Sequence, residues 1–298
     1  MNVLSLFDGI SCAYLALKKL DIPISNYYAS EIDKYAIKVS KENNPDIIHL
    51  GDVRNIKPEN LPKIDLLIGG SPCQDLSNAQ KGEGLKGEKS RLFYEYIRIF
   101  KEVKPKYFLL ENVQNKWGDL MSEIIGVKHI TINSSLFSAQ SRPRYYWTNI
   151  PIKELPNNLQ KERIKDIKEN NVDEKYFFDN QPILDFLNSI DINKYKTETK
   201  EGIIKLFDLP KEVHNDNERQ RRVYSIESKS PTILARTDTT KIYDNGRIRK
   251  LTPLECERLQ KIPDNYTKSC SDTQRYKMIG NAFTVDTIAH ILKGINNE

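Results

Sequence analysis

Residues 64–74 have the sequence IDLLIGGSPCQ, a short apolar run followed by two glycines, a serine, a proline and a cysteine. Such a run, bounded by glycine and proline, predicts a buried strand over 64–68 in a parallel sheet. The loop that leaves the carboxyl end of such a strand lies where α/β proteins bind their ligands. Pro72 stiffens this loop, and we therefore predict that Cys73 is a nucleophile rather than a buried apolar residue.

Short strands alternate with amphipathic helices throughout the first half of the chain. Asp33 is expected to cap a helix that ends before Pro45, and apolar residues recur at helical spacing over 91–104. This alternation predicts an α/β fold with a doubly wound, mostly parallel sheet. The predicted strands are 3–7, 27–30, 47–50, 64–68 and 107–110, and the β-rich runs 129–137 and 145–150 are expected to close the sheet with a hairpin.

The alternation stops after Pro151, where the chain becomes polar as far as about residue 210. Regular structure returns at Thr252, which begins a capping box and a helix through Leu259, and 285–292 reads as a last helix. The length of 298 residues suits one large domain and a smaller one. We therefore predict boundaries that separate 1–150, 151–245 and 246–298.

The composition is that of a globular protein, with 38% hydrophobic and 29% charged residues. No segment has the roughly 18 consecutive apolar residues of a membrane span, and the amino terminus lacks a basic signal-peptide region, so we expect a cytoplasmic protein. The net charge is +5, with an excess of basic residues between 211 and 250 that is consistent with a polyanionic partner. The cysteines and histidines have no metal-ligand spacing, which predicts reduced thiols and no metal.

Three strand ends carry residues suited to a nucleoside ligand. Gly9 permits a tight turn into a helix after the first strand, and Glu31 follows the second strand, where an acid can bind ribose hydroxyls. Asp52 follows the third strand. The glycines do not match the dinucleotide pattern G-x-G-x-x-G, so these residues favour an adenosine-containing cofactor over a nicotinamide cofactor.

An acid and two guanidiniums accompany the predicted nucleophile. Glu111 follows an apolar run at the end of the fifth strand, where it can donate a proton. Arg142 and Arg144 precede another β-rich run and are suited to stabilise an anion.

The order of these motifs resembles that of the DNA cytosine-5 methyltransferases, and the resemblance extends over most of the chain. Residues 172–176 are similar to the segment that opens the variable region in bacterial members. Two departures are Ser11, where most members have glycine, and Ile32, where some have tryptophan. Residues 71–77 also resemble the animal de novo branch, but the long regulatory regions of that branch are absent from this sequence, so we expect a bacterial or phage enzyme. The matching segments are 7–9, Glu31, Asp52, 71–74, 111–113, 140–144, 249–260 and 274–283.

The resemblance implies transfer of a methyl group from S-adenosyl-L-methionine (AdoMet) to C5 of a flipped-out cytosine in a specific duplex DNA sequence. It implies that the Cys73 thiolate adds to C6 of the base. Glu111 would bind N3 and the exocyclic amine, and Arg144 would bind O2. It also implies an AdoMet-binding catalytic domain over 1–150, a target-recognition domain over 151–245 and a returning segment over 246–298.

Further site residues follow from the same resemblance. Arg142 would orient Glu111, and Asn112 would steady the loop of Pro72 and Cys73. The DNA-binding candidates are Gln74, Arg221, Arg222, Thr232 and Arg236. The cofactor-binding candidates are Phe7, Asp8, Gly9, Ile10, Ser11, Glu31, Ile32, Asp52, Val53, Asn281 and Phe283.

Three alternatives remain open at this stage. An RNA cytosine-5 methyltransferase would share the fold, although the Cys-Phe-Thr signature of the tRNA-modifying branch is absent from the sequence. A DNA-binding regulator with an inactive site is the second, although every catalytic position is filled. A nicotinamide-dependent oxidoreductase is the third. We expect a monomer that binds double-stranded DNA and neither a membrane nor a metal.

Overall fold

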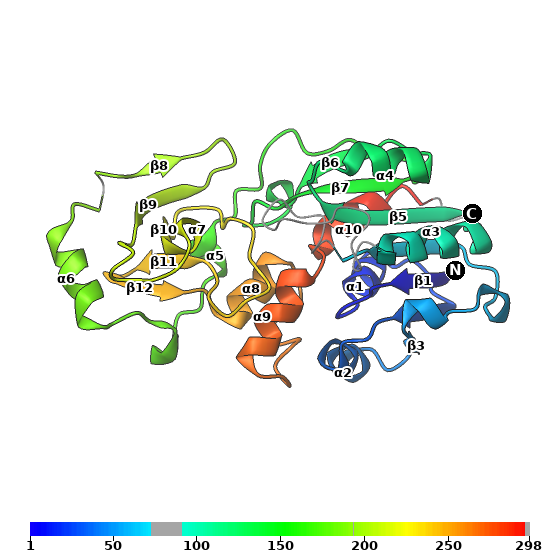
Figure 1. Cartoon of the computed structure of the whole chain (residues 1–298), viewed down its shortest axis with the longest axis horizontal. Helices are drawn as coiled ribbons and strands as arrows, with labels where there is room; N and C mark the ends of the chain where they lie inside the picture. The colour runs from blue at the N-terminus through cyan, green and yellow to red at the C-terminus, as the bar shows by residue number, and fades with distance from the viewer. Residues whose placement is uncertain (73–90, 193, 296–298) are drawn as a thin grey trace. The chain divides into compact units, whose positions relative to one another are not determined.

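The computed structural model describes residues 1–72, 91–192 and 194–295, so the predicted site residues Cys73 and Gln74 lie outside the described residues. The chain forms two compact units, and Figure 1 traces it from one terminus to the other. The first unit comprises Met1–Asn133, Pro143–Leu155 and Phe283–Glu298, and the second comprises Ser134–Arg142 and Pro156–Ala282.

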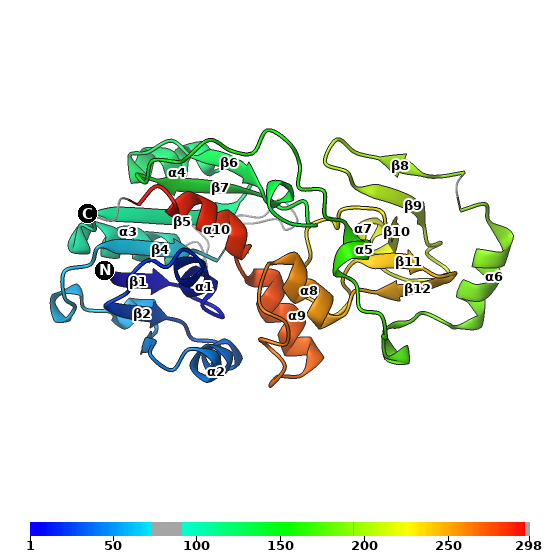
Figure 2. The ribbon, with the colours of Figure 1, turned by 180° about the vertical axis from the view of Figure 1, so that it is seen from behind.

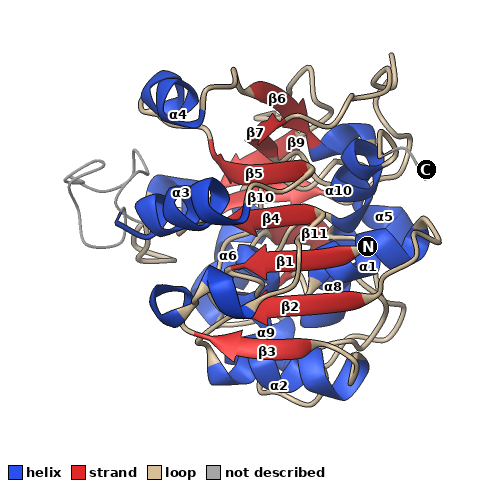
Figure 3. Ribbon diagram, turned by 90° about the vertical axis from the view of Figure 1, so that its right-hand side faces the viewer, coloured by secondary structure: helices blue, strands red, loops and turns tan. Residues whose placement is uncertain are grey.

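A seven-stranded sheet organises the first unit, with the strand order β3-β2-β1-β4-β5-β7-β6. The first five strands of the sequence run parallel, and β7 is antiparallel to both β5 and β6 (Figure 3). The predicted α/β fold and the predicted closing hairpin are therefore confirmed. The strands are β1 (Asn2–Leu6), β2 (Asn26–Ser30), β3 (Ile48–Gly51), β4 (Leu66–Gly70), β5 (Tyr107–Val113), β6 (Ile130–Asn133) and β7 (Pro143–Thr148).

Helices cover both faces of this sheet. Figures 1 and 2, which view the molecule from opposite sides, show α3 on one face and α1 and α10 on the other. Asp33 caps α2 as predicted, since its carboxylate accepts a hydrogen bond from the Tyr35 backbone N–H at 2.9 Å. The aromatic stripe of α3 is core, because Phe93 and Tyr96 are fully buried. The helices are α1 (Cys12–Lys19), α2 (Lys34–Asn43), α3 (Arg91–Val103), α4 (Gly118–Ile125) and α10 (Val285–Leu292).

The second unit contains a smaller sheet with the order β12-β11-β10-β9-β8. Its core includes Ile183 of α6, Phe207 of β9 and Val223 of β10, all buried. The strands are β8 (Thr197–Glu198), β9 (Ile204–Asp208), β10 (Arg222–Ser225), β11 (Lys241–Asp244) and β12 (Arg247–Lys250). The helices are α5 (Ile164–Ile167), α6 (Gln181–Ser189), α7 (Glu218–Arg221), α8 (Pro253–Leu259) and α9 (Asp272–Asn281). Short 3-10 helices in the chain are η1 (Val53–Asn55), η2 (Pro58–Asn60), η4 (Ser134–Leu136) and η5 (Glu174–Tyr176).

The division into units differs from the predicted boundaries at 150 and 246. Residues 246–282 belong to the second unit, and only Phe283–Glu298 lies in the first. The physical reason is a buried ion cluster: the fully buried Arg249 of β12 pairs with Asp244 of β11 at 3.1 Å and with Glu255 of α8 at 2.8 Å. The predicted capping box is confirmed, since the Thr252 hydroxyl accepts from the Glu255 N–H at 3.1 Å.

Among the helices in the described ranges, none is both long and apolar enough to cross a membrane.

Candidate active site

Most of the described catalytic and cofactor candidates of the first unit lie at one edge of its sheet. Parallel strands end at the same edge, so the segments that follow β1, β2, β3 and β4 are brought together there (Figure 3). Glu111 and Asn112 lie in β5 near the same edge, because Glu111 is in register with Gly70, the last residue of β4.

An acid and a guanidinium form the centre of this edge. Arg144 Nε lies 3.0 Å from Glu111 Oε1, and the two side chains are only 12% and 14% exposed. Such a pair is largely shielded from solvent, so its attraction is weakly screened. The sequence placed both residues in the site but did not indicate that they pair with each other.

Asn112 fixes the residue that precedes Pro72. Its Nδ2 donates to the Ser71 carbonyl at 3.2 Å and lies 3.0 Å from the Ser71 hydroxyl. Asn112 and Ser71 are both buried. The last described residues before Cys73 are therefore tied to β5.

Phe283 packs against the end of β4. A Cβ added to Gly70 would lie 2.8 Å from Phe283 Cε1 and 3.2 Å from Glu111 Oε2. The absence of a side chain at Gly70 therefore lets an aromatic ring from the far end of the sequence approach the end of β4 beside Glu111.

Gly70→Ala is expected to disturb this packing. Overpacking of this kind typically costs about 1–3 kcal/mol, and the displaced Phe283 ring or Glu111 carboxylate should also slow methylation. Urea unfolding and methyl transfer to DNA, measured at a temperature where the variant is folded, check the two effects. Unchanged stability together with an unchanged rate would contradict the packing described here.

The turn between β1 and α1 has an unusual backbone. Phe7, Gly9 and Ser11 all have positive φ, at 58°, 60° and 63°. A Cβ on Gly9 would meet nothing within 4 Å, so the space beside this backbone is open. Ile10 is 1% exposed, and its side chain therefore belongs to the core rather than to a ligand surface.

Glu31 is held by backbone N–H groups. Its Oε2 accepts from Gly9 N at 2.8 Å, and its Oε1 accepts from Ile32 N at 2.8 Å and Asp33 N at 2.9 Å. Ile32 presents an apolar side chain that is 69% exposed. An oriented carboxylate beside an exposed aliphatic side chain and an open turn fits an adenosine cofactor.

The remaining cofactor candidates differ in their partners, their burial and the unit to which they belong. Asp52 forms an ion pair with Arg54, whose hydrogen bonds hold the pKa of the Asp52 carboxyl below its ordinary value. Val53 is buried in the core of the first unit. Asn281 ends α9 in the second unit, whereas Phe283 belongs to the first.

Arg142 belongs to the second unit and is buried there. Its Nη2 donates to the carbonyls of Gly280 at 2.9 Å and Ala282 at 3.1 Å. Within the same unit, Gln140 is fully buried and donates to Gln260 Oε1 at 3.1 Å. The segment 140–142 is therefore fixed by buried hydrogen bonds.

The DNA-binding candidates of the second unit are largely engaged with protein groups. Arg221 Nη1 donates to the Leu209 carbonyl at 2.6 Å, and Arg222 pairs with Glu218 at 2.7 Å. Thr232 Oγ1 donates to the Ser141 carbonyl at 2.9 Å.

Arg219, which was not a predicted site residue, lines a shallow cavity of the second unit with Arg222, Thr232 and Lys241. It is exposed and forms no ion pair with any residue in the described part of the chain. The sequence alone could not distinguish Arg219 from the neighbouring arginines, because it does not show which of them have protein partners.

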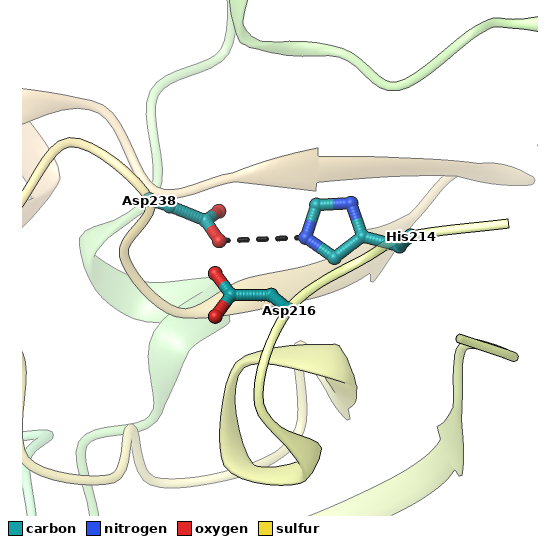
Figure 4. Close-up of side chains that lie close together, drawn as sticks. All are labelled: His214, Asp216 and Asp238. Carbon is teal, nitrogen blue, oxygen red and sulfur yellow. Dashed lines mark hydrogen bonds and ion pairs between the residues drawn. The ribbon is translucent and has the colours of Figure 1, made fainter. Parts of the chain in front are cut away.

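A second polar cluster in this unit contains His214, Asp216 and Asp238 (Figure 4). His214 Nε2 lies 3.4 Å from Asp238 Oδ2. Both carboxylates already have cationic partners, since Arg236 pairs with Asp216 at 2.6 Å and Lys241 pairs with Asp238 at 2.6 Å. Because these cations balance the carboxylates, we assign no metal to the cluster.

Comparisons with known proteins identify the family of this chain. A model of the C-5 cytosine-specific DNA methylase family matches residues 1–297. The Type II methyltransferase M1.ScrFI of Lactococcus lactis subsp. cremoris is 34% identical over 313 aligned residues, which cover 96% of this chain and 76% of that protein. The Type II methyltransferase M.FnuDI of Fusobacterium nucleatum is 27% identical, with 99% of this chain and 94% of that protein covered.

Two solved structures share the fold. The methyltransferase EhMeth of Entamoeba histolytica has a TM-score of 0.72 at 17% identity, covering 99% of this chain and 97% of that one. The Dnmt2 methyltransferase of S. pombe has a TM-score of 0.71 at 17% identity, covering 99% of each chain.

The fold and the sequence matches together define a methyltransferase. This chain belongs to the C-5 cytosine-specific DNA methylase family, as its motifs predicted, and is a DNA (cytosine-5) methyltransferase.

Proposed function

We propose that the enzyme uses AdoMet to methylate C5 of a flipped-out cytosine in a specific duplex sequence, with a covalent bond between Cys73 and C6. The observation that carries this proposal is the shielded pair of Glu111 and Arg144 at the end of β5. Asn112 ties the residues just before Cys73 to the same strand. The acid and the cation therefore lie on the strand to which Ser71, two residues before Cys73, is hydrogen-bonded or on its neighbour.

The nucleophile makes C5 reactive. The Cys73 thiolate forms a bond to C6, and the electrons of the C5–C6 double bond move onto C5. After C5 has been methylated, removal of the C5 proton restores the double bond and expels the thiolate. When bound, AdoMet supplies the electrophilic methyl group.

Glu111 and Arg144 act on the opposite edge of the base. In its protonated form Glu111 donates its O–H to N3 as negative charge develops in the ring, and its other carboxyl oxygen accepts from the exocyclic amine. Arg144 holds Glu111 and offers further N–H donors to O2 of the cytosine. Arg142 remains the residue that we propose to orient Glu111. Its own position is fixed by the buried hydrogen bonds of segment 140–142.

The cofactor residues are assigned by their chemistry. The fixed carboxylate of Glu31 would accept hydrogen bonds from ribose hydroxyls, and the exposed Ile32 would pack against the adenine. Asp52 would bind the adenine amine, and the open turn at Gly9 would receive the amino-acid end of AdoMet. Phe283 would close this pocket beside Gly70.

The second unit would recognise the target sequence, because its basic residues suit a polyanion. We further propose that the enzyme acts as a monomer in the cytoplasm, without a resident metal. Bisulfite sequencing of DNA from a host that expresses the enzyme tests the activity and reveals its target site. Methylated cytosines in a single sequence context are expected, and an unmodified genome would contradict the proposal.

Arg219→Gln is expected to weaken DNA binding. The logarithm of the binding constant falls with the logarithm of salt concentration, and this negative slope should become shallower by about one. Arg222→Gln is the matched control, since Arg222 already pairs with Glu218 and should change the slope less. Titration of labelled duplex at several salt concentrations measures both. A larger effect at Arg222 than at Arg219 would contradict the assignment.

A further inference from the structure

A chain of buried hydrogen bonds lies behind the turn that joins β1 to α1. Asp8 Oδ2 accepts from the Ser11 hydroxyl at 2.5 Å, and Asp8 Oδ1 accepts from the Tyr27 hydroxyl at 2.7 Å. Ser11 Oγ lies 2.7 Å from Ser40 Oγ on α2, and Ser40 Oγ lies 3.3 Å from His49 Nε2 on β3. Asp8, Ser11, Tyr27 and Ser40 are all buried. These hydrogen bonds therefore link the turn to three other elements of the first unit, β2, α2 and β3.

The chemistry of Asp8 sets the direction of these bonds. Burial raises the pKa of Asp8 to about 6, so its carboxyl is ionised at neutral pH. An ionised carboxylate only accepts hydrogen bonds, so Ser11 and Tyr27 must donate to it. Ser11 Oγ is then free to accept from Ser40, and Ser40 to accept from His49. Hydrogen bonds to an ionised group are stronger than those between neutral groups. The ionised Asp8 therefore stabilises this series of hydrogen bonds.

Ser11 needs such an anchor because of its backbone. Its φ of 63° and ψ of 38° lie in the left-handed region, which is unfavourable for residues with a Cβ. Ser11 is the N-cap residue of α1, yet its side chain makes no capping hydrogen bond to the helix. The hydroxyl is used instead to hold Ser11 to Asp8 and Ser40.

The turn is connected to the proposed cofactor site from its other side. Gly9, between Asp8 and Ser11, donates its N–H to Glu31 at 2.8 Å. Fixing Asp8 and Ser11 therefore also fixes the N–H of Gly9 and the entry into α1.

We propose that Asp8, Ser11 and Ser40 are positioning residues for the cofactor, locking the turn at residues 7–11 in the conformation that binds AdoMet. This inference rests on the proposed function. The three side chains act through the backbone of the turn, which is fixed before the ligand arrives and so loses less freedom on binding.

Affinity for S-adenosylhomocysteine, measured by titration calorimetry, tests the proposal without turnover. Ser11→Ala removes the hydroxyl but keeps the unfavourable backbone, and should raise Kd by about tenfold or more. Ser11→Gly accepts the left-handed backbone and should raise Kd by a smaller factor. Ser40→Ala, which leaves the bond from Ser11 to Asp8 in place, should have the smallest effect.

Asp21→Ala is the matched control, because Asp21 follows α1 with φ of 52° but lies outside the chain of hydrogen bonds. Its Kd should stay at the wild-type value, and melting curves without ligand show that each variant is folded. Equal affinity of the wild type, Ser11→Ala and Ser11→Gly would overturn the positioning role. A wild type that does not bind S-adenosylhomocysteine would overturn the proposed cofactor as well.

A pH series separates positioning from a general structural role. At pH 7.5 the ionised Asp8 accepts from Ser11, and Asp8→Asn should bind the ligand more weakly than the wild type. At pH 5.5 Asp8 is mostly protonated and loses an acceptor site, so the two affinities should converge. The same ratio of wild-type to Asp8→Asn affinity at both pH values would overturn the role of Asp8. The other titratable groups near Asp8 and its partners are Cys12, Tyr27, Glu31, Lys41 and His49, and all of them are kept in Asp8→Asn.

Discussion

Cys73→Ser is expected to lower methyl transfer to DNA by roughly a thousandfold or more, since losing a catalytic nucleophile removes most of the rate enhancement. A serine hydroxyl is a much weaker nucleophile than a thiolate at neutral pH. Binding of S-adenosylhomocysteine and of duplex DNA should remain close to that of the wild type. Transfer of a labelled methyl group from AdoMet, measured with enzyme in excess, gives the rate.

Cys270→Ser is the matched control for this variant. Cys270 is partly exposed, whereas Cys12 and Cys256 are buried, and burial raises the pKa of the Cys256 thiol. The Cys270→Ser enzyme should therefore methylate at the wild-type rate. Loss of activity in Cys270→Ser together with a normal rate in Cys73→Ser would reverse the assignment.

Glu111→Gln is expected to slow methylation by about a hundredfold or more, because an amide cannot deliver a proton to N3. The substitution also leaves the guanidinium of Arg144 without its carboxylate partner. Single-turnover rates measure the chemical step, and DNA affinity measured beside them shows whether binding is preserved.

Glu123→Gln, on the exposed side of α4, is a control for the loss of one negative charge from the first unit. It should have the wild-type rate. A Glu111→Gln enzyme with normal turnover would remove Glu111 from the proposed mechanism.

Local sequence patterns predicted most of the first unit, although not helix α4. The strand after Lys63, the cap at Asp33 and the last helix all lie close to where they were expected, because each depends on neighbouring residues. The position of the candidate site at one sheet edge could then be predicted, because parallel strands end on the same side of a sheet.

The second unit was predicted poorly. Residues 151–210 were read as a polar stretch, yet they include α6 and β9. One signal was missed: Asn245 and Gly246 form a turn with φ of 50° and 84° between β11 and β12, and Asn-Gly is a strong hairpin sequence.

Long-range partners could not be derived from the sequence. The pairing of Arg144 with Glu111 joins positions far apart in the chain and depends on the register of β5 with β7. The pairing of Arg222 with Glu218 is different, since a spacing of four residues could have indicated it.

The most direct test of the central claim, that Cys73 attacks C6, uses a duplex with 5-fluorocytosine at the target position. The base should be methylated once and then stay attached to the protein, because fluorine cannot leave C5 as a proton does. We expect an adduct that survives denaturing electrophoresis, requires AdoMet, forms with Cys270→Ser and is absent with Cys73→Ser. An adduct that persists in Cys73→Ser would contradict the mechanism.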